Sequence, residues 1–271
     1  MDAGDGLCLH VETSGEGPPL VVLHGFTGST ETWESLRSVA ELTHTVIAVD
    51  LPGHGNSSAP NDPGCYALTR FADDLLHVLD EVSVQRTAVL GYSMGGRAAL
   101  RFALAHGDRV AALILESMSP GIVDEADRRA RVHADNVLAD AIESDGIEAF
   151  VNRWERLPIW NTQQTVPADV RNRLRAQRLE NRQEGLANSL RGAGPGCDEP
   201  VHHRLGEVDA PTLLIAGALD SKYVEIATSM NHAMPNARLH IIPDAGHAAH
   251  FERPDAFASA VLAFLKDISR A

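Results

Sequence analysis

The sequence has no long apolar run and few cysteines. No stretch reaches the roughly 18–20 apolar residues that a membrane-spanning helix needs. The three cysteines, Cys8, Cys65 and Cys197, form no C-x-x-C pair, and their odd number fits no disulfide framework. The first residues are acidic and lead into no apolar stretch, so we expect no secretory signal. These absences predict a cytoplasmic protein with reduced cysteines and no membrane partner.

Basic residues are outnumbered, and lysine is especially rare. The formal net charge is −14, and lysine supplies only 2 of the 23 basic residues. A charge of this sign argues against nucleic acid or an anionic membrane surface as a partner. Residues 121–204 differ from the rest, because they hold 12 arginines against 14 acidic residues, whereas the remaining chain has 11 basic and 23 acidic residues. Compositional bias is one explanation, and arginines that face a cleft and bind carboxylates are the other.

Short β-rich runs alternate with helical patterns in the first half of the chain and again near its end. The apolar runs are continuous rather than alternating, which is typical of strands buried on both faces of a parallel sheet. We predict helices over residues 69–82 and 254–268, where apolar residues recur on one face. The predicted strands are residues 7–13, 19–24, 45–50, 87–90, 110–116, 212–216 and 237–242.

The middle of the chain breaks this pattern. Residues 120–205 contain no convincing buried strand, only charged amphipathic helical stretches broken by Pro158, Pro167 and a Gly/Pro-rich segment. We therefore expect a core of residues 1–119 and 206–271 with a helical cap of residues 120–205. Such a cap would cover the carboxyl ends of the strands, where open α/β sheets bind ligands.

A G-x-S-x-G pentapeptide, Gly91–Gly95, lies between a predicted strand and a helix-forming stretch. A strand that turns abruptly into a helix holds the middle residue on a strained corner with its hydroxyl exposed. The flanking glycines avoid collisions between Cβ atoms and the adjoining backbone. This context predicts that Ser93 is an activated serine.

Three further segments follow predicted strands and complete a catalytic arrangement. His24–Gly28 predicts an oxyanion hole made by the N–H groups of Phe26 and Met94. Asp220 ends one strand and His247 lies on a loop after the next, so the chain order Ser, Asp, His predicts a triad of Ser93, Asp220 and His247.

Alternatives exist for the acid, and no metal site is expected. Glu116, at a strand end, and Asp244, just before the histidine, are the rival acids. The histidine pairs His202/His203 and His247/His250 lack metal-ligand spacing with nearby carboxylates. We therefore predict a triad that works without a metal or other cofactor.

Over essentially its full length the chain resembles the α/β-hydrolase fold, with Asp50–Ser57 as a further hallmark. Several segments resemble one branch, the 2-succinyl-6-hydroxy-2,4-cyclohexadiene-1-carboxylate synthases of menaquinone biosynthesis. The most specific are Gly-Gly-Arg at residues 95–97 and Asp-Ser-Lys-Tyr at 220–223. The other matching segments are Leu23–Ser29 with Trp33, Ser119–Gly121, Ser189–Gly192 and Ala245–His250.

The resemblance implies a lyase rather than a hydrolase. Members expel pyruvate from an enolpyruvyl-succinyl-cyclohexene-carboxylate, and the activated serine removes a proton instead of attacking a carbonyl. The substrate is a small polycarboxylate, which suits guanidinium groups. By position, the substrate-binding residues correspond to Arg97, Arg131, Arg178, Tyr92 and Trp154.

Each of these assignments has a structural alternative. Arg97 in the first turn of a helix opposes the helix dipole, which favours ligand contact over a stabilising role. Arg131 and Arg178 lie in charged helical runs and could be solvated, and Trp154 could simply anchor the cap. Glu155 departs from the family pattern, in which some members have an aromatic residue at this position, and an extra acid near a polyanion site is unfavourable.

Two other functions share the same motifs. One is a carboxylesterase or C–C bond hydrolase that forms an acyl-enzyme on Ser93. The other is a small-molecule receptor on the same fold that signals through its cap.

Overall fold

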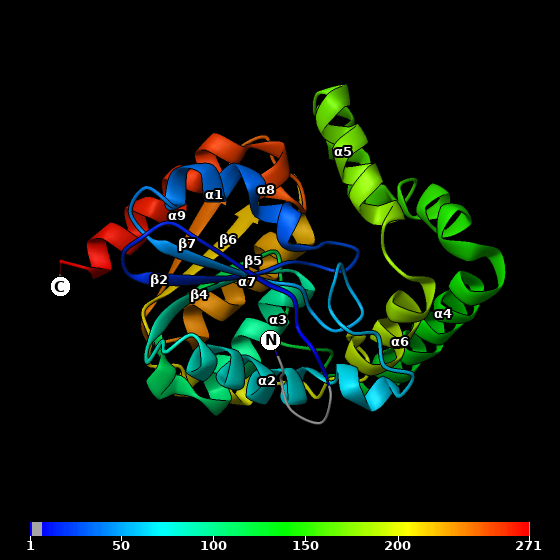
Figure 1. The fold of residues 1–271 in the computed structure, drawn as a ribbon, viewed down its shortest axis with the longest axis horizontal. Coiled ribbons are helices and arrows are strands. Elements are labelled where there is room, and N and C mark those ends of the chain that lie inside the picture. Colours follow the sequence, from blue (N-terminus) through cyan, green and yellow to red (C-terminus); the bar gives the residue numbers. More distant parts are fainter. Residues whose placement is uncertain (2–6, 271) are drawn as a thin grey trace.

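Seven strands form one mostly parallel sheet (Figure 1). The computed structural model describes Met1 and residues 7–270. Within them the sheet order is β1-β3-β2-β4-β5-β6-β7; β1 is antiparallel to β3, and the other neighbouring pairs are parallel. The bounds are β1 Val11–Ser14, β2 Pro19–Leu23, β3 Thr45–Val49, β4 Thr87–Tyr92, β5 Val110–Glu116, β6 Thr212–Gly217 and β7 Ala237–Ile242. The predicted edge strand of residues 7–13 begins only at Val11, and the apolar Leu7 and Leu9 are buried in the core outside the continuous ladder.

Helices cover both faces of the sheet, which explains the continuous apolar runs. Val21 and Leu23 of β2 pack on one side with α2, α3 and α7, while Leu20 and Val22 pack on the other with α1 and α9. Successive strand residues point to opposite faces, so a strand covered on both sides must be apolar throughout. The helices are α1 Glu34–Ala40, α2 Leu68–Glu81, α3 Met94–Ala105, α7 Ser221–Ala233, α8 Ala249–Glu252 and α9 Pro254–Ile268.

The segment between β5 and β6 is a helical insertion with an apolar core of its own. Residues 117–211 are described in full and contain no strand. Their helices are α4 Glu125–Trp154, α5 Ala168–Leu179 and α6 Gln183–Ala193, with 3-10 helices η4 Pro158–Thr165 and η5 His202–Glu207. α4 and α6 pack through Ile142, Phe150 and Leu186, and α5 extends away from them (Figure 1). The predicted fold class, an α/β-hydrolase fold with a helical cap, is confirmed.

The sheet order brings two loops together at the carboxyl ends of the central strands. From β2 the chain crosses to β3 on one side and then returns to β4 on the other, so β2 and β4 are neighbours. A Cβ atom on Gly95, at the start of α3, would lie 2.3 Å from the carbonyl oxygen of Leu23. The loops that follow β2 and β4 therefore meet at the switch point where such sheets bind ligands.

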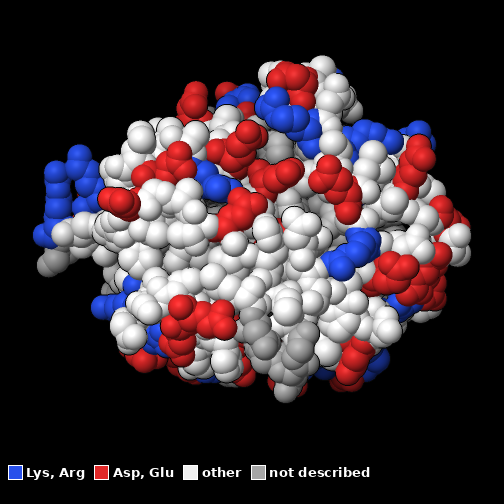
Figure 2. Space-filling model, in the orientation of Figure 1, with Lys and Arg blue, Asp and Glu red and all other residues white. Residues whose placement is uncertain are grey.

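Acidic side chains are spread over the surface seen in Figure 2, and basic ones occur in separate groups, including one beside α5. In the described part of the chain, no helix has both the length and the apolar character to cross a membrane.

Candidate active site

The turn from β4 into α3 holds Ser93 in a strained conformation. Its backbone has φ +52° and ψ −107°, a region that side chains with a Cβ rarely adopt. A Cβ on Gly91 would lie 2.2 Å from the carbonyl oxygen of Gly95, so this turn can form only with glycine at that position. The predicted elbow is present, and its serine borders a cavity between the sheet and the cap.

Ser93, His247 and Asp220 lie within hydrogen-bonding distance of one another. The Ser93 Oγ is 3.2 Å from His247 Nε2, and His247 Nδ1 is 2.8 Å from Asp220 Oδ2. A carboxylate accepts from Nδ1–H, which leaves Nε2 to accept the proton of the Ser93 hydroxyl. The three residues come from the ends of β4, β6 and β7, as the sequence order predicted.

The two rival acids lie elsewhere. Glu116 is fully buried, and its carboxylate accepts hydrogen bonds from the backbone N–H and Nδ1 of His250, at 3.0 and 2.8 Å. Asp244 is exposed, with φ +54°. Of the three carboxylates, only that of Asp220 is hydrogen-bonded to His247.

The loop after β2 is held by His24, whose role the sequence did not reveal. Its Nδ1–H donates to the Gly25 carbonyl at 2.7 Å, and its Nε2 accepts from the Leu51 N–H at 3.0 Å. These partners fix the neutral form, and complete burial lowers the pKa of His24 to about 4. The same loop carries Phe26, and no hydrogen bond joins its amide to another described residue. Met94 is the first residue of α3, so its N–H has no carbonyl within that helix.

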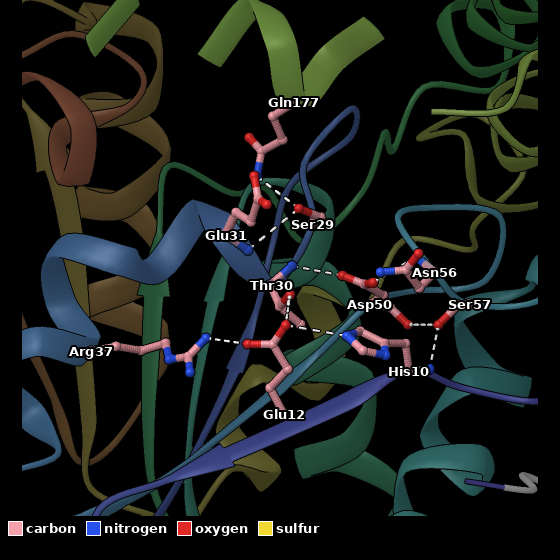
Figure 3. A network of polar contacts seen from close by, with 10 residues as sticks. All are labelled: His10, Glu12, Ser29, Thr30, Glu31, Arg37, Asp50, Asn56, Ser57 and Gln177. Atoms are coloured by element: carbon pink, nitrogen blue, oxygen red, sulfur yellow. Dashed lines mark hydrogen bonds and ion pairs between the residues drawn. The ribbon is translucent and has the colours of Figure 1, made fainter. Parts of the chain in front are cut away.

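A polar network connects this loop to the cap and the first strands (Figure 3). The Gln177 amide, on α5, donates to the hydroxyls of Ser29 and Thr32 at 2.9 and 3.2 Å. One step along the loop, the Thr30 N–H donates to Asp50 Oδ1 at 2.6 Å. The cap and the predicted oxyanion loop are thus joined by side-chain hydrogen bonds, which positions the loop relative to the cavity.

The cavity bordered by Ser93, Asp220 and His247 is named the catalytic cavity after the predicted triad. It has a volume of about 560 Å³ and is bordered by nine of the ten predicted site residues. Arg97 lies in its wall and is almost fully buried. Its guanidinium donates to the Ala193 carbonyl at 2.5 Å and lies 3.6 Å from Asp198, which also pairs with Arg101 at 2.6 Å. Burial lowers the pKa of Arg97, an effect that Asp198 opposes. The nine bordering residues are Phe26, Tyr92, Ser93, Met94, Arg97, Arg131, Trp154, Asp220 and His247.

Arg131 borders the same cavity from the cap. Its Nε donates to both carboxylate oxygens of Asp135, at 2.9 and 3.0 Å, one helical turn further along α4. Burial raises the pKa of Asp135, and the Arg131 charge opposes that shift. The guanidinium is partly exposed, so it can still reach an anion in the cavity.

Arg178 is the predicted site residue that does not border the catalytic cavity. It borders a separate void of about 30 Å³, and its guanidinium lies 5.4 Å from the centre of the Trp160 ring. Glu155, expected to disfavour a polyanion, forms ion pairs with Arg175 and Arg178 at 2.6 and 3.1 Å. It is therefore a counter-ion of the cap arginines rather than a free charge in the cavity.

Two aromatic residues beside His247 escaped the sequence analysis as site residues. The His247 ring lies 4.5 Å from Tyr223, 5.5 Å from Tyr92 and 5.7 Å from Trp160, measured between centroids. Tyr223 follows Asp220 by three residues, which was the available signal. Trp160 lies 87 residues before His247 in an insertion whose spacing carries no comparable motif.

Among residues 7–270, no group of three or more His, Cys, Asp or Glu side chains is arranged so that it could bind a metal ion.

Comparison with known proteins shows the family. The α/β hydrolase fold family model matches residues 18–254. A Bacillus subtilis (strain 168) protein, provisionally named a 2-succinyl-6-hydroxy-2,4-cyclohexadiene-1-carboxylate synthase, is 41% identical over 257 residues, which cover 93% of each chain. The synthase of that name from Enterobacter sp. (strain 638) is 30% identical over 250 residues, 92% of each chain. A solved structure of MenH from S. aureus superposes with a TM-score of 0.92 at 35% identity, covering 96% of this chain and 99% of that one.

The fold, the elbow and these similarities agree with the resemblance seen in the sequence, and the chain belongs to the α/β hydrolase fold family, in the branch of the 2-succinyl-6-hydroxy-2,4-cyclohexadiene-1-carboxylate synthases.

Proposed function

We propose that the protein eliminates pyruvate from an enolpyruvyl-succinyl-cyclohexene-carboxylate to give 2-succinyl-6-hydroxy-2,4-cyclohexadiene-1-carboxylate. The observation that carries the proposal is the hydrogen-bonded series Ser93–His247–Asp220 in a cavity that also contains Arg97 and Arg131. Relatives that bear the synthase name over almost their whole length support it.

In the proposed step Ser93 acts as a base. Its hydroxyl proton passes to His247 Nε2, and the resulting oxygen takes a proton from a ring carbon of the substrate. The electron pair of that C–H bond forms a ring double bond as the C–O bond to the enolpyruvyl group breaks. The leaving enolate takes up the proton held on His247 and becomes pyruvate, while the proton taken from the ring carbon restores the Ser93 hydroxyl. Asp220 stabilises the imidazolium that forms in between.

Negative charge develops on a substrate oxygen as the proton leaves. The N–H groups of Phe26 and Met94 would stabilise it, since neither is used in a hydrogen bond within the described chain. Arg97 and Arg131 would bind the carboxylates that take no part in bond breaking. A guanidinium binds a carboxylate through two parallel hydrogen bonds, which also orients the ring.

The test is pyruvate release measured by a coupled assay with freshly generated substrate. Wild type should release pyruvate, Ser93→Ala should not, and Ser38→Ala, which alters an exposed hydroxyl on α1, should match wild type. A p-nitrophenyl ester is assayed in parallel. Ester turnover with a product burst, and no pyruvate release, would overturn the proposal in favour of an acyl-enzyme hydrolase. Ligand-dependent cap mobility with negligible turnover of either compound would point to the receptor alternative.

The cytoplasmic location remains part of this proposal. A biosynthetic enzyme of this kind would meet its substrate there.

A further inference from the structure

One fully buried carboxylate, that of Glu116, takes no part in the proposed step. Glu116 is the last residue of β5, on the same face of the strand as Ala112 and Ile114, which pack in an apolar cluster. An ionisable group at the end of such a row costs stability unless it is paired, so an apolar side chain would serve packing better. Residues that break the local pattern in this way occur mainly at functional sites. The position therefore indicates a role beyond packing.

Glu116 contacts both the turn that carries Ser93 and the loop that carries His247. Its backbone carbonyl accepts from the Ser93 N–H at 2.9 Å. Its carboxylate accepts from the backbone N–H and Nδ1 of His250, at 3.0 and 2.8 Å. His250 lies on α8, three residues after His247. One residue thus joins the two segments whose separation sets the distance of 3.2 Å between Ser93 Oγ and His247 Nε2.

A second buried carboxylate holds the other side of the His247 loop. Glu252 is 5% exposed, and its Oε2 accepts from the Gly246 N–H at 2.7 Å. The residues at both ends of the loop, Gly246 and His250, therefore donate their backbone N–H groups to buried carboxylates. Such charge-assisted hydrogen bonds are shorter and stronger than those between neutral groups. Glu252 belongs to the same segment and shapes the loop, whereas Glu116 attaches the loop to the sheet.

The His250 side chain is itself held in one place. It is 6% exposed, and its ring lies 4.5 Å from Tyr92, 5.1 Å from Trp33 and 5.9 Å from Phe257, measured between centroids. A ring packed among other aromatic rings in a close-packed interior cannot turn to another partner without disturbing its neighbours. The contact between Glu116 and His250 is therefore a rigid link between the sheet and the loop.

We infer that Glu116 is a positioning residue, which holds the His247 loop at the distance from Ser93 that proton transfer requires. It acts through His250 and does not border the catalytic cavity, so it does its work without touching the substrate. The inference rests on the proposed function, because it takes His247 as the proton acceptor of Ser93. Such a step is sensitive to placement, since a displacement of about 1 Å can lower a rate by roughly 100-fold.

The experiment follows the Nδ1 protons of His247 and His250 by proton NMR. Each Nδ1 lies 2.8 Å from a carboxylate oxygen, which is the distance of a strong charge-assisted hydrogen bond. A proton in such a bond resonates far downfield and exchanges slowly with water. His247→Gln and His250→Phe identify the two signals by removing them. Glu116→Ala should remove the His250 signal and also broaden the His247 signal beyond detection, whereas a merely local role would leave the His247 signal unchanged.

Pyruvate release gives a second readout. Glu116→Ala should lower kcat about tenfold or more and leave KM within about twofold of wild type, because it changes the geometry of proton transfer and not the wall of the cavity. Glu116→Gln should restore most of kcat and the His247 signal, since an amide oxygen still accepts from the His250 N–H. Rescue by this uncharged side chain of the same shape would assign the effect to position rather than to charge.

Asp74 provides the matched control. It is a buried carboxylate on α2 that pairs with Arg70 at 3.9 Å and does not border the catalytic cavity. Asp74→Ala should keep the kcat and the His247 signal of wild type. His250→Phe tests the inference where Glu116→Ala does not fold, because it keeps the packed ring and removes the side-chain donor to Glu116. It should lower kcat, leave KM unchanged and weaken the His247 signal.

The outcomes separate this inference from the proposed reaction. A folded Glu116→Ala protein with the kcat and the His247 signal of wild type would overturn the inference. Equal losses in Glu116→Ala and Glu116→Gln would overturn it as well, because the effect would then come from the charge, and so would a wild type without a His247 signal. A His247 signal that depends on Glu116, in a protein that releases no pyruvate, would support the inference and reject the proposed reaction.

Discussion

Replacing Ser93 by glycine should give a more stable protein than replacing it by alanine, and both changes should abolish activity. The residue has φ +52° and ψ −107°. These angles mirror φ −52° and ψ +107°, an extended conformation, so a glycine adopts them without strain. Serine and alanine both carry the Cβ that makes the conformation costly. Ser93→Ala is therefore the proper reference, because it also lacks the hydroxyl and its hydrogen bond to His247.

The magnitude follows from two opposing effects. A residue other than glycine held in such a conformation costs about 1–3 kcal/mol. Glycine loses about 0.5–1 kcal/mol more backbone entropy on folding than alanine. The free energy of unfolding of Ser93→Gly should thus exceed that of Ser93→Ala by about 1 kcal/mol. For a chain of this size the thermal midpoint would rise by about 2–4 °C.

Urea unfolding followed by circular dichroism, together with calorimetry, measures the difference between the two variants. Ser83 provides a control, since it also has a positive φ, +58°, but lies in an exposed turn before β4. Ser83→Gly should gain stability over Ser83→Ala and keep full pyruvate release. If Ser93→Gly is no more stable than Ser93→Ala, no backbone strain is stored at the elbow and the reasoning fails.

Three further predictions concern charges. Arg97→Gln should raise KM for the proposed substrate about tenfold or more, with a smaller effect on kcat, because a hydrogen bond to a charged group contributes about 1.5–3 kcal/mol. If the steady-state kinetics of this variant equal those of wild type, the assignment of Arg97 to polyanion binding is refuted. Asp198→Asn should lower the free energy of unfolding by about 3–5 kcal/mol, since it leaves two buried guanidiniums unpaired. Asp169→Asn, which breaks an exposed ion pair, should change the free energy of unfolding by under about 0.5 kcal/mol. If urea unfolding gives the same change for Asp198→Asn and Asp169→Asn, this account is contradicted. The pKa of His24 is lowered from 6.5 to about 4 in the folded protein, so between these pH values the unfolded chain binds one more proton than the folded chain. The contribution of His24 to the free energy of unfolding is therefore complete above pH 6.5 and falls by about 3 kcal/mol as the pH drops to 4. In pH-dependent unfolding, His24→Gln should lose less stability over this range than wild type.

The sheet was predictable because burial on both faces leaves a local signature. Leu20–Leu23 are fully buried by helices on both sides, and the sequence shows them as an unbroken apolar run. The elbow was predictable for a similar reason. Its glycines are required by contacts within a few residues, such as that between Gly91 and Gly95, so the pattern is contained in a short segment.

The cap side chains were less predictable, because their partners lie far away in the chain. α5 carries arginines at most turns, and nothing local distinguishes Arg178, which is buried over Trp160, from Arg173, which is exposed. Gln177 binds Ser29 across 148 residues. A helical insertion packs through long-range contacts, and its polar positions do not reveal which of them face the cavity.

The near-neutral charge of residues 121–204 also takes on a different meaning once the partners are known. A buried guanidinium without a counter-ion would be strongly destabilising. Arg131 has Asp135 and Arg178 has Glu155, both supplied by the cap itself, and Arg97 on the core has Asp198 of the same segment. Each carboxylate offsets the cost of the arginine's charge in the unliganded protein. The guanidinium N–H groups that do not contact the carboxylate can still donate to an anion. A nearly even balance of charge in such a segment is therefore compatible with anion binding, because the acids allow Arg97 and Arg131 to border one cavity and Arg178 to border the void beside it.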